Sequence, residues 1–185
     1  MADTRRTVST LTGTTFVDGQ AAGSITPQDM RDFIVTTKNA QGSSYVSVAA
    51  ANTITTQSVL EASVGTWALE TSPTAYLFST GGTADERLIY GGTNTTKVLI
   101  QAIACIGSAT GSETISIGIG KNGTLISNTE VHTATHVITV PTNIATSTIV
   151  EMATNDYLQL FVGNESSAGN ITVEYGRLIA TGLVA

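Results

Sequence analysis

From residue 45 onward, apolar and polar side chains alternate at every second position in one short segment after another. In the clearest example Ile115, Ile117 and Ile119 alternate with small or hydroxyl-bearing residues. Successive residues of a strand point to opposite faces, so the alternation predicts strands with one buried face. Such segments follow each other about every 8 to 12 residues, divided by Gly, Asn, Ser and Pro, which is typical of a sandwich. The predicted strands are 45–50, 53–60, 65–70, 75–79, 87–90, 97–106, 114–119, 124–131, 136–140, 148–152, 157–162 and 171–179. The pattern predicts an all-β, antiparallel, jelly-roll-like sandwich.

One predicted strand, 97–106, is apolar on both faces. It is expected to be a central strand or a strand covered by another subunit. We predict a β-sandwich oligomerisation domain over 41–185, with 91–185 as its most compact part. Residues 36–65 carry few large apolar side chains, so two interpretations stay open for them: the first strands of the sandwich, or a linker that pairs with neighbouring chains.

Residues 1–40 have a different character and are predicted to form an N-terminal arm with one short helix. Thr26 suits the N-cap, Pro27 the first turn, and Asp29 the third position of a capping box. Met30, Phe33 and Ile34 then form one apolar stripe. A helix of two turns is unstable alone, so the stripe must pack against the chain's own sandwich or against a partner protein. Residues 1–24 are Thr- and Gly-rich and are expected to be ordered only where they dock.

Composition narrows the range of partners. Only 12% of the residues are charged and the net charge is −6, with a sequence pI of about 4.7. Phosphate binding requires clustered basic residues, so no nucleic-acid partner is expected. The single cysteine, Cys105, allows no disulfide within the chain and is expected to be a small buried apolar residue. No apolar run is long enough for a membrane span, and no secretory signal is recognised. We therefore expect a protein made in a cytoplasm that does not bind membranes.

Two motifs that suggest chemistry have simpler explanations. Residues 118–123 match the dinucleotide fingerprint G-x-G-x-x-G, but a strand-like segment follows where that motif requires a helix. Asn122-Gly123 instead predicts a type I′ hairpin turn. Glu130 and His132 share a strand face and His136 is near in sequence, so a zinc site is one possibility; surface or subunit-interface histidines are the preferred interpretation. We predict no metal site, no cofactor and no catalytic residues, hence no enzyme.

The N-terminal segment matches a known sequence pattern. Met1-Ala-Asp-Thr-Arg, followed by Ile25-Thr-Pro-Gln-Asp-Met-Arg-Asp-Phe-Ile-Val, resembles the arm and helix shared by many small virion proteins of tailed bacteriophages. The resemblance implies attachment to a virus particle. Residues that would attach to the shell are Thr26, Met30, Phe33 and Ile34.

A second segment is similar to a different group of proteins. Asn155-Asp-Tyr-Leu-Gln-Leu-Phe-Val-Gly-Asn and Asn170-Ile-Thr-Val-Glu-Tyr-Gly-Arg-Leu-Ile-Ala resemble the last strands of trimeric jelly rolls of the tumour-necrosis-factor and complement globular-head type. The resemblance implies a homotrimer in which one face of strand 157–162 lines the sandwich core and the other the threefold axis. Residues expected at the trimer interface are Tyr157, Gln159 and Phe161.

These expectations combine into one hypothesis. The chain is expected to be a structural virion protein on the particle surface, a homotrimeric capsid decoration (cement) or head-fibre protein. Its N-terminal arm would contact the major capsid protein or another virion protein. The alternative is a tail-fibre or receptor-binding protein whose loops 107–112 and 164–170 recognise the host surface.

Overall fold

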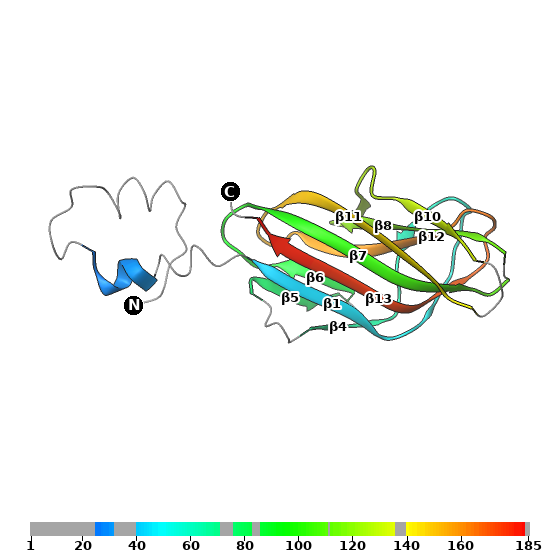
Figure 1. Cartoon of the computed structure of the whole chain (residues 1–185), viewed down its shortest axis with the longest axis horizontal. Helices are drawn as coiled ribbons and strands as arrows, with labels where there is room; N and C mark the ends of the chain where they lie inside the picture. Colours follow the sequence, from blue (N-terminus) through cyan, green and yellow to red (C-terminus); the bar gives the residue numbers. More distant parts are fainter. Residues whose placement is uncertain are drawn as a thin grey trace. The chain divides into compact units, whose positions relative to one another are not determined.

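A computed structural model describes residues 25–31, 40–70, 76–82, 86–110, 112–135 and 140–183. The chain divides into two compact units: residues 1–39 with 184–185, and residues 40–183. The second unit is a sandwich of two sheets in which all paired strands run antiparallel (Figure 1). Among the described residues, no helix is long and apolar enough to cross a membrane.

We call the two layers sheet A and sheet B. Sheet A has the strand order β11 (Thr142–Met152), β7 (Thr96–Ser108), β13 (Ile171–Gly182), β1 (Gln41–Val48) and β4 (Thr66–Leu69), with β2 (Ala51–Asn52) beside β13. Sheet B has the order β10 (Val131–Ala134), β8 (Thr114–Lys121), β12 (Tyr157–Asn164), β6 (Arg87–Tyr90) and β5 (Phe78–Gly81), with β3 (Glu61–Ala62) beside β12 and β9 (Thr124–Leu125) beside β8. From β10 to β13 the chain changes sheet at every connection, so the predicted all-β, jelly-roll-like sandwich is confirmed.

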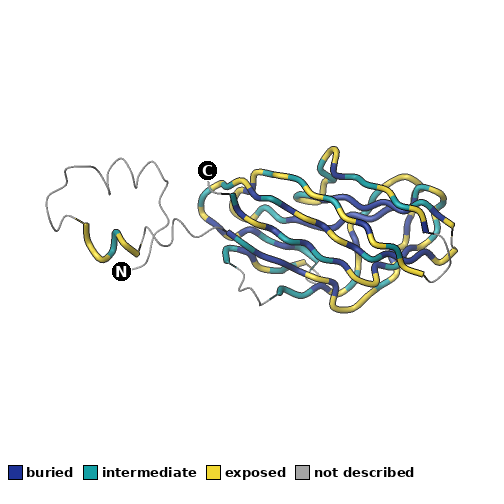
Figure 2. The backbone as a smooth tube through the Cα atoms, viewed as in Figure 1, coloured by how far each residue is buried: buried dark blue, intermediate teal, exposed yellow. Residues whose placement is uncertain are grey.

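The core lies between the inner faces of the two sheets. Ile115, Ile117 and Ile119 of β8 are completely buried there, as their alternation predicts, and Figure 2 shows buried and exposed positions alternating along the strands. β7 lies between β11 and β13, as a strand with two apolar faces requires. Its inner residues, from Val98 to Ile106 at every second position, are fully buried.

Among the described residues, two of the predicted strands are wrong; the predicted strand 136–140 lies almost entirely outside them. Residues 53–60 contain no strand: Glu61 Oε1 accepts from Thr55 N at 3.1 Å in place of a strand partner, and Ser58 lies in a turn at φ 59°. The segment 124–131 is also not one strand. It splits into β9 and the start of β10, since Asn128 lies at φ 65° in the intervening turn.

The segment 36–65, for which two interpretations were open, contains a central strand. β1 pairs with β13 on one side and β4 on the other, so residues 41–48 are part of the sandwich. The chain enters and leaves this unit at one end, where Gly182 N donates to Ala40 O at 2.6 Å. At the other end, Ile171 of β13 is paired with Ser108 of β7.

The short helix of the first unit covers residues 27–31. Asp29 N donates to Thr26 Oγ1 at 3.1 Å, and Thr26 N donates to Asp29 Oδ2 at 2.9 Å. These reciprocal bonds form the predicted capping box, with aspartate in place of the usual glutamate. The predicted Asn122-Gly123 hairpin is confirmed as well, since both residues have positive φ, 53° and 78°.

Candidate functional site

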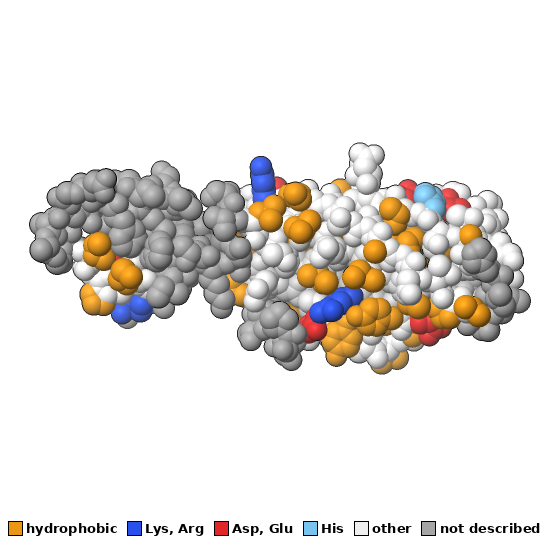
Figure 3. All heavy atoms as spheres, in the orientation of Figure 1, with side chains coloured by type: hydrophobic (Ala, Val, Ile, Leu, Met, Phe, Trp, Pro, Cys, Tyr) orange, Lys and Arg blue, Asp and Glu red, His pale blue; other side chains and the backbone are white. Residues whose placement is uncertain are grey.

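The outer face of sheet A carries large apolar side chains that the sandwich itself does not cover. Tyr45, Ile103, Ile149 and Tyr175 are exposed on β1, β7, β11 and β13. The sheet register places Tyr45 beside Arg177, and Arg177 beside Ile103, in one row across three strands. In Figure 3 the apolar side chains gather over these strands with few charged groups between them. We refer to this surface as the sheet A face.

The charge in the middle of the sheet A face is paired. The Arg177 guanidinium forms an ion pair with Glu70 and its Nε donates to Ser43 Oγ at 3.1 Å. Hydrogen bonds from Ser43 and from Arg177 hold the pKa of Glu70 below its ordinary value. Cys105 also lies here, half-buried opposite Tyr175, and not in the core as its sequence pattern suggested. An adjoining subunit covering this face would meet no unpaired charge at Arg177.

The predicted trimer contacts lie elsewhere, on the outer face of sheet B. Leu158, Leu160 and Val162 of β12 are in the core, so the alternate residues Tyr157, Gln159 and Phe161 face outward. Gln159 and Phe161 are nevertheless only 6% and 7% exposed within a single chain. Tyr157 is half-buried under the Arg87 guanidinium, 4.5 Å from the ring centroid. Their role in a trimer stays a prediction.

Glycines explain why Phe161 is buried on an outer face. A Cβ atom on Gly120 would stand 2.1 Å from Phe161 Cε2, and one on Gly118 would stand 2.4 Å from a methyl carbon of Leu125. The outer face of β8 is therefore a shallow trough that Phe161, Leu125 and Leu60 fill. Removal of the Phe161 side chain would uncover sheet B itself.

Of the residues predicted to attach the chain to a shell, two are described. Thr26 caps the helix, and Met30 is 47% exposed on it. Phe33 and Ile34 lie outside the described residues, so the complete apolar stripe stays a prediction. Ile25, just before the cap, adds a second exposed apolar side chain.

A buried carboxylate joins two loops at the end of the sandwich where β7 meets β8. Glu113 is 6% exposed, and the hydroxyls of Ser108 and Ser167 donate to its two oxygens. Burial alone would raise the pKa of Glu113, but hydrogen bonds from Ser108, Ser167, Thr110 and Asn164 outweigh it and hold the pKa below 4.5. The ionised group therefore stabilises the folded chain.

Replacement of this carboxylate is expected to lower the free energy of unfolding. Glu113→Gln loses charged hydrogen bonds worth about 1.5–3 kcal/mol at neutral pH. Because the folded-state pKa is depressed, the stabilisation is complete above the ordinary pKa and is lost as pH falls through the folded value. Urea unfolding of wild type and variant, at neutral pH and at about pH 3, measures the difference in their unfolding free energies at each pH. Glu151→Gln, which replaces an exposed carboxylate, is the control. An equal difference in unfolding free energy at both pH values would contradict the role of the Glu113 charge.

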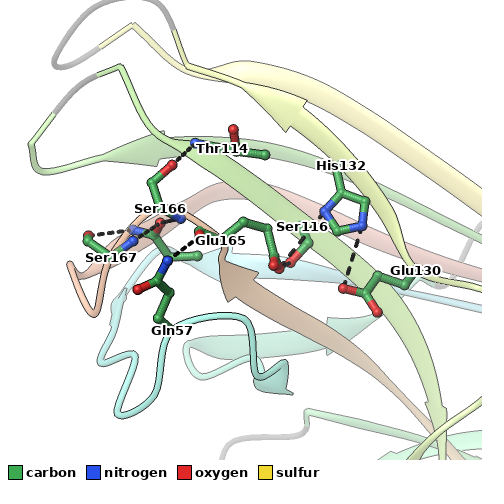
Figure 4. Close-up of polar contacts among 9 residues, drawn as sticks. Gln57, Thr114, Ser116, Glu130, His132, Glu165, Ser166 and Ser167 are labelled. Carbon is green, nitrogen blue, oxygen red and sulfur yellow. Dashed lines mark hydrogen bonds and ion pairs between the residues drawn. The ribbon is translucent and has the colours of Figure 1, made fainter.

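A second polar cluster lies beside β10 and the end of β12 (Figure 4). His132 Nε2 is 3.6 Å from Glu130 Oε1, and His132 Nδ1 is 3.9 Å from Glu165 Oε1. The sequence placed Glu130 and His132 together but gave no signal for Glu165, which comes from a segment distant in the chain. His136 lies outside the described residues. The candidate fingerprint 118–123 falls on β8 and its hairpin, where no helix follows.

A hollow of about 100 Å³ lies on the outer side of β1 and β13. Arg177 is the one ionisable residue that lines it, and this guanidinium is already paired with Glu70. The hollow therefore offers neither an acid nor a base to a substrate.

Comparison with known proteins adds little to this picture. No family model matches the chain and no curated protein is similar to it at a significant level. Among solved structures, Eiger TNF from S. frugiperda is similar with a TM-score of 0.49 at 12% identity, over 78% of this chain and 92% of that one. Murine APRIL is similar with a TM-score of 0.45 at 7% identity, over 77% of this chain and 99% of that one. By its own sheet order, the chain is an antiparallel jelly-roll-like sandwich protein.

Proposed function

We propose that this chain is a structural, non-enzymatic virion protein that forms a homotrimer and decorates a phage capsid as a cement or head-fibre protein. The observation that carries self-association is the sheet A face, which exposes Tyr45, Ile103, Ile149 and Tyr175 around an already paired arginine. The location on a phage particle is proposed from the sequence resemblance of the N-terminal segment. The capped helix at 27–31 supports an attachment role.

The occupant proposed for the sheet A face is another copy of the same chain. Apolar surface that stays exposed on a folded unit favours association, and aromatic side chains are enriched at interfaces. The polar groups around it are mostly hydroxyls and amides of β1, β7 and β11, whose burial leaves few charges unpaired. A chain with so few charged residues is suited to being covered by its own copies.

Attachment to the shell would use three weak contacts in place of one strong contact. Each trimer carries three N-terminal segments, and simultaneous binding of linked contacts raises the overall affinity far above that of a single contact. This makes a short helix with one capping box a sufficient anchor. Cryo-EM of labelled particles or immunogold labelling tests the location. Label confined to the tail would end the capsid assignment, and a stable monomer in analytical ultracentrifugation would end the trimer.

The exposed Met30 side chain is the described residue best placed to test attachment. Met30→Asp is expected to weaken binding to undecorated particles more than about tenfold, because burial of a Met side chain contributes about 1.5–3 kcal/mol at each contact. Co-sedimentation with particles measures the bound fraction. Gln28→Glu is the matched control, since it adds the same charge near the helix N-terminus, where a negative charge is favourable. Equal binding by Met30→Asp and wild type would contradict the attachment role.

A receptor-binding or tail-fibre protein is the second candidate function. The connections after β7 and after β12 adjoin at one end of the sandwich, where Ala109 N donates to Asn170 O at 3.3 Å. Loops so joined present one surface, as a binding tip requires. A cell-binding assay with the purified protein separates the two functions, since saturable binding to host cells favours the receptor-binding protein and its absence favours the cement protein.

A further inference from the structure

Three side chains that bind metals in other proteins meet at the end of sheet B. Glu130 and His132 flank the start of β10, and Glu165 directly follows β12. One ligand atom from each residue lies within 4.8 Å of the other two. In Figure 4 the two carboxylates approach the imidazole from different sides. The donors come from two segments that only the fold brings together.

Glu165 is held in position more firmly than a surface carboxylate needs to be. The hydroxyl of Ser116, a residue with no exposed surface, donates to Glu165 Oε1 at 2.7 Å. The backbone of Glu165 is fixed on both sides, since its N donates to Thr114 O and its O accepts from Gln57 Nε2, each at 2.7 Å. A hydrogen bond to a carboxylate oxygen is the arrangement that orients ligands in metal sites.

The cluster also has an unbalanced charge. Among the described residues, neither Glu130 nor Glu165 forms an ion pair with a lysine or an arginine; their partner is His132. Two carboxylates beside one imidazole leave an excess of negative charge that a divalent cation would neutralise. The sheet A face shows the contrast, since there the carboxylate of Glu70 is matched by Arg177.

We propose that Glu130, His132 and Glu165 bind one divalent transition-metal ion, with Zn²⁺ as the ion of best fit. An imidazole nitrogen together with carboxylate oxygens suits zinc, whereas calcium and magnesium take oxygen ligands alone. Water completes the coordination, because the side chains of His132 and Glu130 are 49% and 34% exposed. The bound ion ties the start of β10 to the segment after β12.

Only small movements are needed for the donors to reach bonding distance. Ligand atoms about 2.0–2.1 Å from a tetrahedral zinc ion are roughly 3.4 Å apart. The atoms here are separated by up to 4.8 Å, so the exposed side chains of Glu130 and His132 must turn toward Glu165. Glu165, fixed by Ser116, is the stationary ligand.

Isothermal titration of the chelator-treated full chain with zinc chloride tests the site. Saturable binding at one ion per chain is expected, with a rise of several degrees in melting temperature. His132→Ala and Glu165→Gln are expected to weaken binding more than about 100-fold, and Ser116→Ala about tenfold, the usual effect of removing a hydrogen bond that orients a metal ligand. Calcium chloride is expected to give no saturable binding.

Two variants serve as controls for the titration. Glu151→Gln removes an exposed carboxylate elsewhere, and His136→Ala removes the other histidine; both are expected to bind zinc as wild type does. The proposal is overturned by absence of saturable zinc binding to the wild type, by binding that survives in His132→Ala, or by loss of binding in His136→Ala alone. Tighter binding of calcium than of zinc would equally overturn it.

Discussion

The double variant Ile103→Asp, Tyr175→Asp is expected to sediment as a monomer while keeping its β-sheet circular dichroism. The two side chains lie on neighbouring strands of the sheet A face and are 37% and 44% exposed, so the single chain tolerates a charge there. In a trimer the new carboxylates would be buried without partners, at a cost of about several kcal/mol per interface. Sedimentation equilibrium is expected to show a dissociation constant more than about a thousandfold higher than that of wild type.

The chain offers a matched control for this variant. Val59 and Val64 are 46% and 49% exposed on the connections that flank β3, beside sheet B. Val59→Asp, Val64→Asp adds the same charge to similar apolar side chains and is expected to leave the proposed trimer intact. If the control dissociates and the sheet A variant does not, the interface lies on sheet B, near the predicted Tyr157, Gln159 and Phe161 contacts.

Phe161→Ala is expected to destabilise the fold by about 3–5 kcal/mol, the usual cost of deleting a buried aromatic side chain. The ring is 7% exposed in a single chain and fills the trough above Gly120, so its loss uncovers sheet B. Chemical denaturation measures the change in unfolding free energy, and sedimentation of the folded variant is expected to show the same oligomer as wild type.

The role of Phe161 is separated from that of a subunit contact by a second substitution. Gly120→Ala places a Cβ where the ring lies and is expected to destabilise wild type, but to cost less in the Phe161→Ala background because the clash is gone. A fully stable Phe161→Ala chain that no longer self-associates would show instead that the ring is an intersubunit contact.

Sequence patterns predicted those parts of the fold in which side-chain alternation decides the structure. The strands at 87–90 and 114–119 follow directly from one buried face, and the hairpin at Asn122 follows from two residues that accept positive φ. The patterns failed at 53–60, where β-branched residues suit a strand but Glu61 captures the backbone donor of Thr55 and Ser58 turns the chain at positive φ. Such capture depends on three-dimensional neighbours, which alternation does not describe.

The candidate sites were predictable to a smaller degree. Alternation placed Phe161 and Gln159 on one face, but it does not show what covers that face. One signal was present: Gly118 and Gly120 alternate with isoleucines, and a strand face without side chains leaves room for a large neighbour. Nothing in the sequence links Glu165 to His132, because their approach depends on the pairing of β8 with both β10 and β12.

The proximity of Ala40 and Gly182 has a consequence for how the parts of this protein can be ordered in a gene. A segment fused after β13 leaves the sandwich from the same end as the natural N-terminal segment. β13 has 12 residues, so this end lies about 40 Å from the one where Ile171 meets Ser108. The fold thus permits a segment joined at either terminus to leave the sandwich from the same end.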